Sequence, residues 1–82
     1  MITLDAVPLG STVRVSTRML PTADQRRLTE LGLGHGARVE VLRRAPFGGP
    51  LALRLIHGGL LALRRCEAAR IIVIVTEAVT ND

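Results

Sequence analysis

The sequence predicts a small all-β barrel of about five strands, with one short helix inserted after the first strand. Short segments of alternating apolar and polar residues recur at hairpin-length spacing, with Gly- and Pro-containing turns between them. The chain has 82 residues, the size of one domain, and its apolar content of 48% is typical of a packed fold. Phe47 is the single aromatic residue, so Leu, Ile and Val must build the core.

Alternation of apolar and polar side chains predicts the individual strands. Val13 and Val15 share one face of the first strand, and Val39 and Val41 share one face of the second. The last strand is rich in β-branched residues and is apolar on both faces from residue 71 to residue 75. The predicted strands are residues 12–16, 38–43, 51–55, 61–63 and 71–76, and residues 67–70 are expected to form one helical turn.

A helix of about nine residues is predicted from Thr22 to Leu31. Thr22 and Gln25 fit a capping box, in which the Thr22 hydroxyl accepts a hydrogen bond from the third helical N–H and Gln25 reaches back to the helix start. Asp24 lies close to the positive end of the helix dipole. These three residues predict where the helix begins.

The end of this helix is predicted at a glycine. Gly32 is suited to the left-handed conformation that closes a helix, and Leu33 is then expected to pack back on Leu28. A helix this short is not stable alone and must dock on the barrel. Leu28 and Leu31 are three residues apart and are expected to form the docking face.

The domain is expected to span residues 1–76, with residues 77–82 as a flexible C-terminal tail. Cys66 is the one cysteine, which excludes an intramolecular disulfide. The first residues show no basic segment followed by a long apolar segment, and so do not resemble a signal peptide. The longest unbroken apolar stretch is too short to span a bilayer. We therefore expect a cytoplasmic protein without direct membrane insertion.

Several separated blocks of the sequence have a distinctive composition and follow one another in a fixed order. The block 27–33 ends in Leu-Gly-Leu and is followed by a turn that ends at Gly36 and by the strand Val39–Val41. The other blocks are Leu4–Gly10, Ala45–Pro50, Leu61–Arg65, Glu67–Ala68 and Ile71–Val73. In this order and spacing the blocks resemble the FeoA family, and the resemblance covers nearly the whole chain.

The resemblance to FeoA implies that the barrel is SH3-like. It also implies a non-enzymatic role in bacterial ferrous iron uptake, as an accessory protein that binds and modulates FeoB, a membrane transporter with a cytoplasmic GTP-binding domain. Two residues depart from the family pattern. His35 stands where the family often has proline, and Gly49 stands where an acidic or polar residue is common. Both lie in predicted turns, so they affect loop chemistry more than the fold.

The residues that carry metal or catalytic chemistry are few. His35, His57 and Cys66 are the nitrogen and sulfur ligands, and their spacing matches no metal-binding motif. We read the two histidines as turn residues and Cys66 as a packed thiol. The sequence contains neither a phosphate-binding GxxxxGK[ST] loop nor any lysine. We expect no cofactor, no metal site and no enzymatic activity.

A partner-binding surface is the remaining candidate site. The formal net charge is +4, and all 11 basic residues are arginines, with adjacent pairs at 26–27, 43–44 and 64–65. Such charges are either solvated or form a basic patch that meets an acidic partner. Phe47 is either an exposed anchor or a lid on the barrel end. Met19 and Leu20 either extend this surface or pack in the core. The candidate residues are Met19, Leu20, Arg26, Arg27, Glu30, Phe47, Arg64 and Arg65.

Two alternative functions stay open at this point. The net charge permits a nucleic-acid-binding barrel, although base stacking requires exposed aromatic side chains and Phe47 is the only aromatic residue. We therefore expect no nucleic-acid partner. The apolar face of residues 71–75 favours a homo-oligomeric assembly module, which is compatible with FeoB binding.

Overall fold

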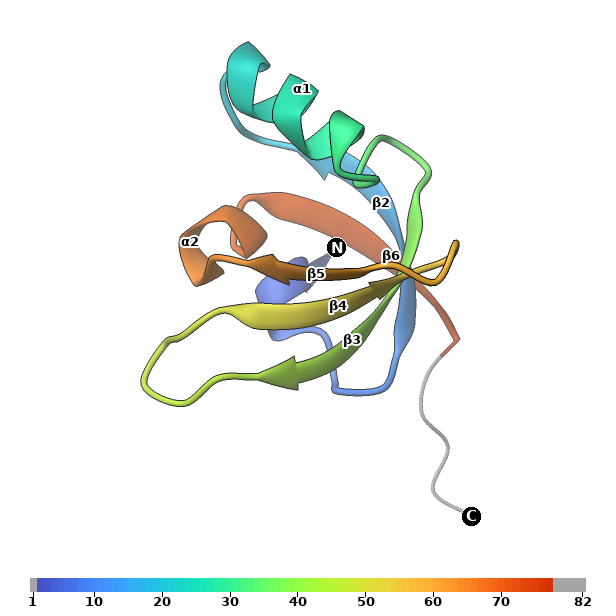
Figure 1. The fold of residues 1–82 in the computed structure, drawn as a ribbon, viewed down its shortest axis with the longest axis vertical. Coiled ribbons are helices and arrows are strands. Elements are labelled where there is room, and N and C mark those ends of the chain that lie inside the picture. The colour runs from blue at the N-terminus through green and yellow to red at the C-terminus, as the bar shows by residue number, and fades with distance from the viewer. Residues whose placement is uncertain (1, 78–82) are drawn as a thin grey trace.

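One antiparallel sheet organises the chain, and its strands follow the order β1-β6-β2-β3-β4-β5 (Figure 1). The structure is a computed structural model that describes residues 2–77. The strands are β1 (Ile2–Thr3), β2 (Thr12–Arg18), β3 (Arg38–Arg44), β4 (Leu51–Leu55), β5 (Leu60–Leu63) and β6 (Ile71–Glu77). The helices are the 3-10 helix η1 (Leu4–Ala6), α1 (Thr22–Glu30) and α2 (Arg65–Ala68).

The predicted fold class is confirmed, with small differences in the element boundaries. The five predicted strands are all present, and the two-residue strand β1 adds a sixth within residues 2–77. The helical turn predicted at 67–70 begins two residues earlier, at Arg65. Strand β6 extends to Glu77, and residues 78–82, the rest of the predicted tail, lie outside the described residues. No helix within the described range is long and apolar enough to cross a membrane.

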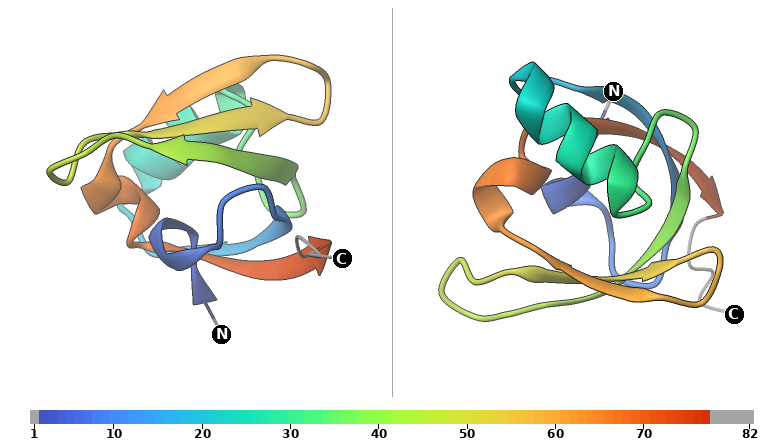
Figure 2. Two further views of the ribbon diagram at one scale, coloured as in Figure 1. Left: turned by 90° about the horizontal axis from the view of Figure 1, so that it is seen from below. Right: turned by 45° about the horizontal axis from the view of Figure 1, so that its top comes forward.

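Strand β2 lies in the middle part of the sheet, between β6 and β3. Val13 lies opposite both Val39 of β3 and Val75 of β6, and Val15 lies opposite Val73. A register shift between Val15 and Thr17 bends the strand, which helps the sheet to curl. Figure 2 shows the curled sheet with α1 lying across one end of it.

The alternating side chains of the strands form the core. In each of β2, β3 and β4, two residues separated by one position are buried, as the sequence pattern predicts. Side chains from η1, α1 and α2 close the same cluster, which contains no aromatic residue. The core consists of Leu4, Val7, Val13, Val15, Leu28, Leu33, Val39, Val41, Leu51, Leu53, Leu63, Ala68, Ile71 and Val73.

The predicted end of α1 is confirmed. Gly32 has a φ of +102°, its N–H donates to the carbonyl of Thr29, and the N–H of Leu33 donates to the carbonyl of Leu28 at 2.7 Å. These two bonds define a Schellman motif. Leu28 and Leu33 are both fully buried, so the turn after α1 also docks the helix on the core.

The capping-box prediction is wrong. Pro21 occupies the N-cap position, and no side chain caps the helix there. The backbone N–H of Gln25 donates to the carbonyl of Pro21, which places Thr22 inside the first turn, where its hydroxyl cannot serve as the cap. The Gln25 side chain donates instead to the carbonyl of Leu20 at 2.7 Å.

The predicted docking face of α1 is half right. Leu28 is fully buried, whereas Leu31 is 40% exposed. Leu31 lies beyond the last helical residue. Leu33 is buried, whereas Leu31, which was expected to be buried, is not. Leu31 therefore belongs to the surface of the protein.

We predict that Gly32→Ala destabilises the fold more than Gly36→Ala does. Both glycines have positive φ, +102° and +83°, so each substitution should cost about 1–2 kcal/mol of unfolding free energy. A Cβ on Gly32 would also lie 3.0 Å from Cδ1 of Leu55, whereas a Cβ on Gly36 meets nothing within 4 Å. Urea unfolding of both variants measures the difference. Equal losses of unfolding free energy in the two variants would contradict a steric clash at position 32.

Candidate partner-binding site

Glu67 joins the two helices at one end of the barrel. Its side chain is only 9% exposed. Its Oε2 accepts a hydrogen bond from Arg27 of α1, and its Oε1 accepts one from Nε of Arg64, the residue before α2, at 3.2 Å. This hydrogen bond and the charge of the carboxylate raise the pKa of Arg64 above its ordinary value. The bond from Arg27 connects α1 to α2, and the bond from Arg64 is local to the start of α2.

In each of the three arginine pairs, one side chain bonds to an acceptor within the protein and the other does not. Arg27 and Arg64 each bind Glu67, and Arg44 donates to the backbone carbonyls of Asp5 and Val7. One member of every pair is thus a structural residue. The side chains of the other members, which are Arg26, Arg43 and Arg65, form no hydrogen bond or ion pair with another described residue.

Phe47 is the most exposed large apolar residue among those described. It lies in the loop between β3 and β4, is fully exposed, and has a φ of +60°. A lid on the barrel end would be buried, so that alternative is wrong. A residue other than glycine costs about 1–2 kcal/mol of conformational free energy in this region of φ. The loop therefore holds its one aromatic ring in solvent in a strained backbone conformation.

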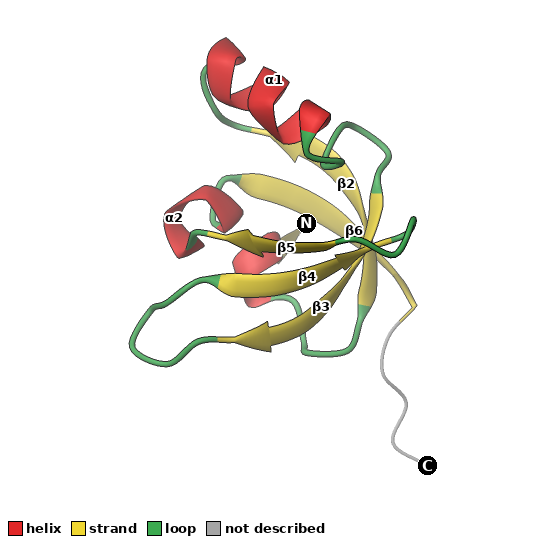
Figure 3. Cartoon of the chain, viewed as in Figure 1, coloured by secondary structure: helices red, strands yellow, loops and turns green. Residues whose placement is uncertain are grey.

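A pocket of about 520 Å³ connects the Phe47 loop to α2. It is lined by Gly48, Gly49, Pro50, Arg64, Arg65, Cys66 and Ala69. Figure 3 shows the β3–β4 loop and α2 at the same end of the barrel. The structure thus places Arg64 and Arg65 in one pocket with the loop residues that follow Phe47, while Phe47 itself does not line the pocket. The Nε of Arg65 is inaccessible to solvent and has no hydrogen-bond partner.

The other predicted residues lie along α1 and at its start. Met19 is 59% exposed, and its N–H donates to the carbonyl of Arg70 at 2.7 Å, which ties the start of α1 to the end of α2. Leu20 is half-buried and packs against the core. Arg26 and Glu30 are exposed on α1. Met19 is consequently a surface residue, and Leu20 belongs in part to the core.

The potential metal ligands lie apart from one another. Nδ1 of His35 is 2.5 Å from the carbonyl oxygen of Ser16, and His57 lies in the β4–β5 turn. Cys66 is exposed on α2, so the prediction of a packed thiol is wrong. Within the described range, no three His, Cys, Asp or Glu side chains group in a way that could hold a metal ion.

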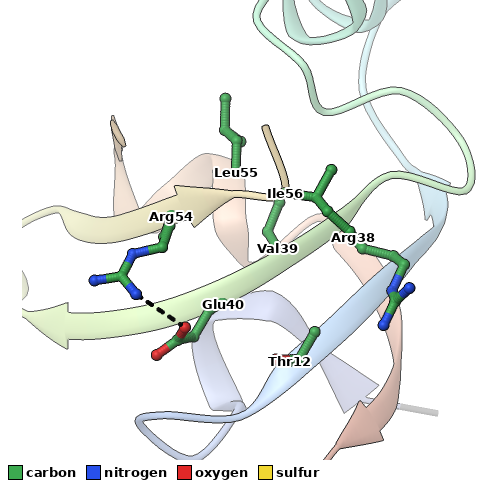
Figure 4. A pocket seen from close by; sticks show the side chains of 7 residues that line it. All are labelled: Thr12, Arg38, Val39, Glu40, Arg54, Leu55 and Ile56. Atoms are coloured by element: carbon green, nitrogen blue, oxygen red, sulfur yellow. Dashed lines mark ion pairs between the residues drawn. The ribbon is translucent and has the colours of Figure 1, made fainter. Parts of the chain in front are cut away.

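A second hollow lies on the β3–β4 face, away from the predicted site residues. It measures about 210 Å³ and is lined by Thr12, Arg38, Val39, Glu40, Arg54, Leu55 and Ile56 (Figure 4). Glu40 and Arg54 lie opposite each other in the sheet and form an ion pair at 3.6 Å. Their charges are therefore paired already.

The apolar face predicted for self-association is partly exposed. Ile71 and Val73 are core residues, while Ile74 and Val75 are 58% and 37% exposed. A shallow hollow of about 380 Å³ lies between them and Ile2. Homo-oligomerisation stays a prediction.

Sequence reasoning missed Glu67, the residue on which this end of the barrel depends. One signal was present, because Glu67 follows Arg64 at the i,i+3 spacing of a helical ion pair. The bond to Arg27 spans 40 residues and has no local signature. Arg44 was missed for the same reason, since its acceptors lie 37 and 39 residues away.

The sheet order, the curled sheet and the short helix define a small SH3-like barrel with an exposed loop at one end. Comparison with solved structures agrees. A FeoA protein from Stenotrophomonas maltophilia, solved with zinc and described as a prokaryotic SH3 domain protein, is 35% identical with a TM-score of 0.71, over 90% of this chain and 91% of that one.

Two further structures and a family comparison identify the family. The FeoA protein of Chlorobium tepidum is 36% identical with a TM-score of 0.83, over 92% of this chain and 70% of that one. A FeoA-like protein of Clostridium acetobutylicum is 32% identical with a TM-score of 0.81, over 99% and 93%. The FeoA domain model matches residues 2–75. A search of curated proteins gave no match. The chain belongs to the FeoA family, which is linked to ferrous iron transport.

We predict that Glu67→Gln lowers the unfolding free energy by roughly 1–2 kcal/mol, because two arginines lose their charged acceptor. The side chains of Arg27 and Arg64 are 44% and 75% exposed, so solvent screens part of the loss. Urea unfolding gives the value. Glu30→Gln is the matched control, since Glu30 is exposed on α1 and its substitution should change stability by less than about 0.5 kcal/mol. Equal effects would contradict a structural role for Glu67.

Proposed function

We propose that this chain is a non-enzymatic cytoplasmic accessory protein of bacterial ferrous iron uptake, which binds and modulates an FeoB-type membrane transporter. The observation that carries the proposal is the FeoA family match over residues 2–75. The S. maltophilia relative is described as a candidate activating factor of ferrous iron transport, and this chain has the same fold. The transporter's cytoplasmic GTP-binding domain is the part within reach of a cytoplasmic partner.

The surface of the barrel supports action by contact. The Phe47 ring is exposed, and Arg26, Arg43 and Arg65 have no partners among the described residues. Aromatic and arginine side chains supply much of the binding energy at protein interfaces. These exposed side chains are therefore of the type that protein partners bind, and they support the proposal.

Nucleic-acid binding is less well supported by the same surface. Base stacking uses several aromatic side chains in succession, and this chain offers Phe47 alone. Three of the six paired arginines are engaged within the protein, by Glu67 or by backbone carbonyls. The basic charge available to a phosphate backbone is correspondingly smaller than the sequence suggests.

We predict that the purified chain binds the cytoplasmic GTP-binding domain of the FeoB from the same genome. Isothermal titration should be carried out with that domain in its GDP-bound state and in a GTP-analogue state, and the GTPase rate should be followed in parallel. We expect binding in at least one nucleotide state. An unrelated bacterial GTPase domain is the control and should not bind. Absence of binding in both states, and an unchanged GTPase rate, would contradict the proposal.

A further inference from the structure

We infer that the pocket between the β3–β4 loop and α2 binds an acidic segment of a protein partner, with the Phe47 ring as the apolar contact beside it. The inference rests on the proposed function for the identity of that partner. It names the chemistry that this pocket recognises, which is a carboxylate next to an apolar side chain.

Arg65 provides the first argument. Its side chain lines the pocket, carries no ion pair with any described residue, and has a solvent-inaccessible Nε without a hydrogen-bond partner. A carboxylate that binds the guanidinium supplies the missing charge partner, and Arg–carboxylate pairs are among the stronger hydrogen-bonded contacts.

The neighbouring arginine is paired with Glu67, so Arg65 supplies the unpaired positive charge of the pocket. Arg64 lines the same pocket with a side chain that is 75% exposed. Its Nε is held by Glu67, which fixes the stem of the side chain. The loop on the other side of the pocket, residues 45–50, contains no acidic residue. The charge of the pocket therefore complements an acidic ligand.

Phe47 provides the second argument, independent of charge. The residue precedes Gly48 and Gly49, which line the pocket, and its ring is fully exposed. The φ of +60° is an unfavourable backbone conformation, and the fully exposed ring makes no buried contact within the described residues that would offset its cost. A partner that covers the ring removes its apolar surface from water and accounts for its retention in this conformation.

The walls of the pocket favour a protein segment over a nucleic acid. Pro50 and Ala69 line it together with the arginines, so its lining combines apolar and basic groups. An acidic peptide with interspersed aliphatic side chains matches both kinds of wall. A nucleic acid would need further stacking platforms beyond the single ring.

The test uses the full chain and a defined probe. The probe is an acetylated and amidated heptapeptide of alternating glutamate and leucine, and its control has glutamine in place of glutamate. Amide chemical shifts of the nitrogen-15-labelled chain follow each titration. We expect shifts at Gly48, Gly49, Arg65 and Ala69 with the acidic peptide, and none with its control.

Three variants assign the contacts. Arg65→Gln should weaken binding of the acidic peptide about tenfold, as loss of one charge-assisted contact does, and Phe47→Ala should weaken it about three- to tenfold. Arg14→Gln removes the same charge from an exposed position on β2 that lies outside the pocket, and should change the affinity less than about twofold. The spectrum of each variant shows directly whether it is folded.

Several outcomes overturn the inference. One is equal binding of the glutamine peptide, and another is equal affinity of the wild type and Arg65→Gln. A third is binding of a thymidine octanucleotide at these same amides in 150 mM salt, more tightly than the acidic peptide.

The FeoB domain separates this inference from the proposed function. Peptide binding at the pocket by a chain that does not bind the FeoB domain removes the proposed function and leaves the pocket chemistry intact. Equal binding of the FeoB domain to the wild type and to Arg65→Gln leaves the proposed function intact and removes the pocket as its contact site.

Discussion

The carboxylate of Glu67 links two parts of the chain that the sheet alone does not connect. It is the one buried charged residue among those described, and it accepts hydrogen bonds from Arg27 near the end of α1 and from Arg64 just before α2. A buried carboxylate without partners would be costly, so the two arginines and Glu67 depend on one another. Because α2 forms one wall of the pocket beside the Phe47 loop, the same contact positions the surface proposed to bind a partner.

The arginine pairs show how a chain of this size combines stability with a binding surface. In each pair, adjacent side chains point in different directions, so one member reaches a fixed acceptor inside the protein while the other stays available. Arg44 holds the N-terminal segment through its carbonyls, and Arg43 beside it is exposed. Arg64 binds Glu67, and Arg65 lines the pocket. The arginines that are bonded within the protein therefore determine where their unpaired neighbours lie on the surface.

The features that could be predicted from the sequence are those that depend on neighbours in the chain. Alternation identified the strands, and Gly32 identified the end of α1, because both follow from local backbone geometry. The helix start was wrong because Pro21 took the N-cap position that Thr22 was expected to fill. For the site, the exposure of Phe47 and the pairing of Arg27 with Glu67 depend on packing between distant segments, which the sequence pattern does not contain. The family resemblance supplied the SH3-like topology, and the described structure supplied the pocket.

The central claim is that the FeoA-like barrel meets its transporter partner at the end that carries Phe47. Photocrosslinking measures this most directly. A photoreactive phenylalanine analogue is placed at position 47 in one sample and at position 57 in another, since His57 lies in the turn at the opposite end of β4. The account predicts a covalent adduct with the cytoplasmic domain of FeoB from position 47 and little or none from position 57. An adduct from position 57 alone, in a complex that forms normally, would contradict it.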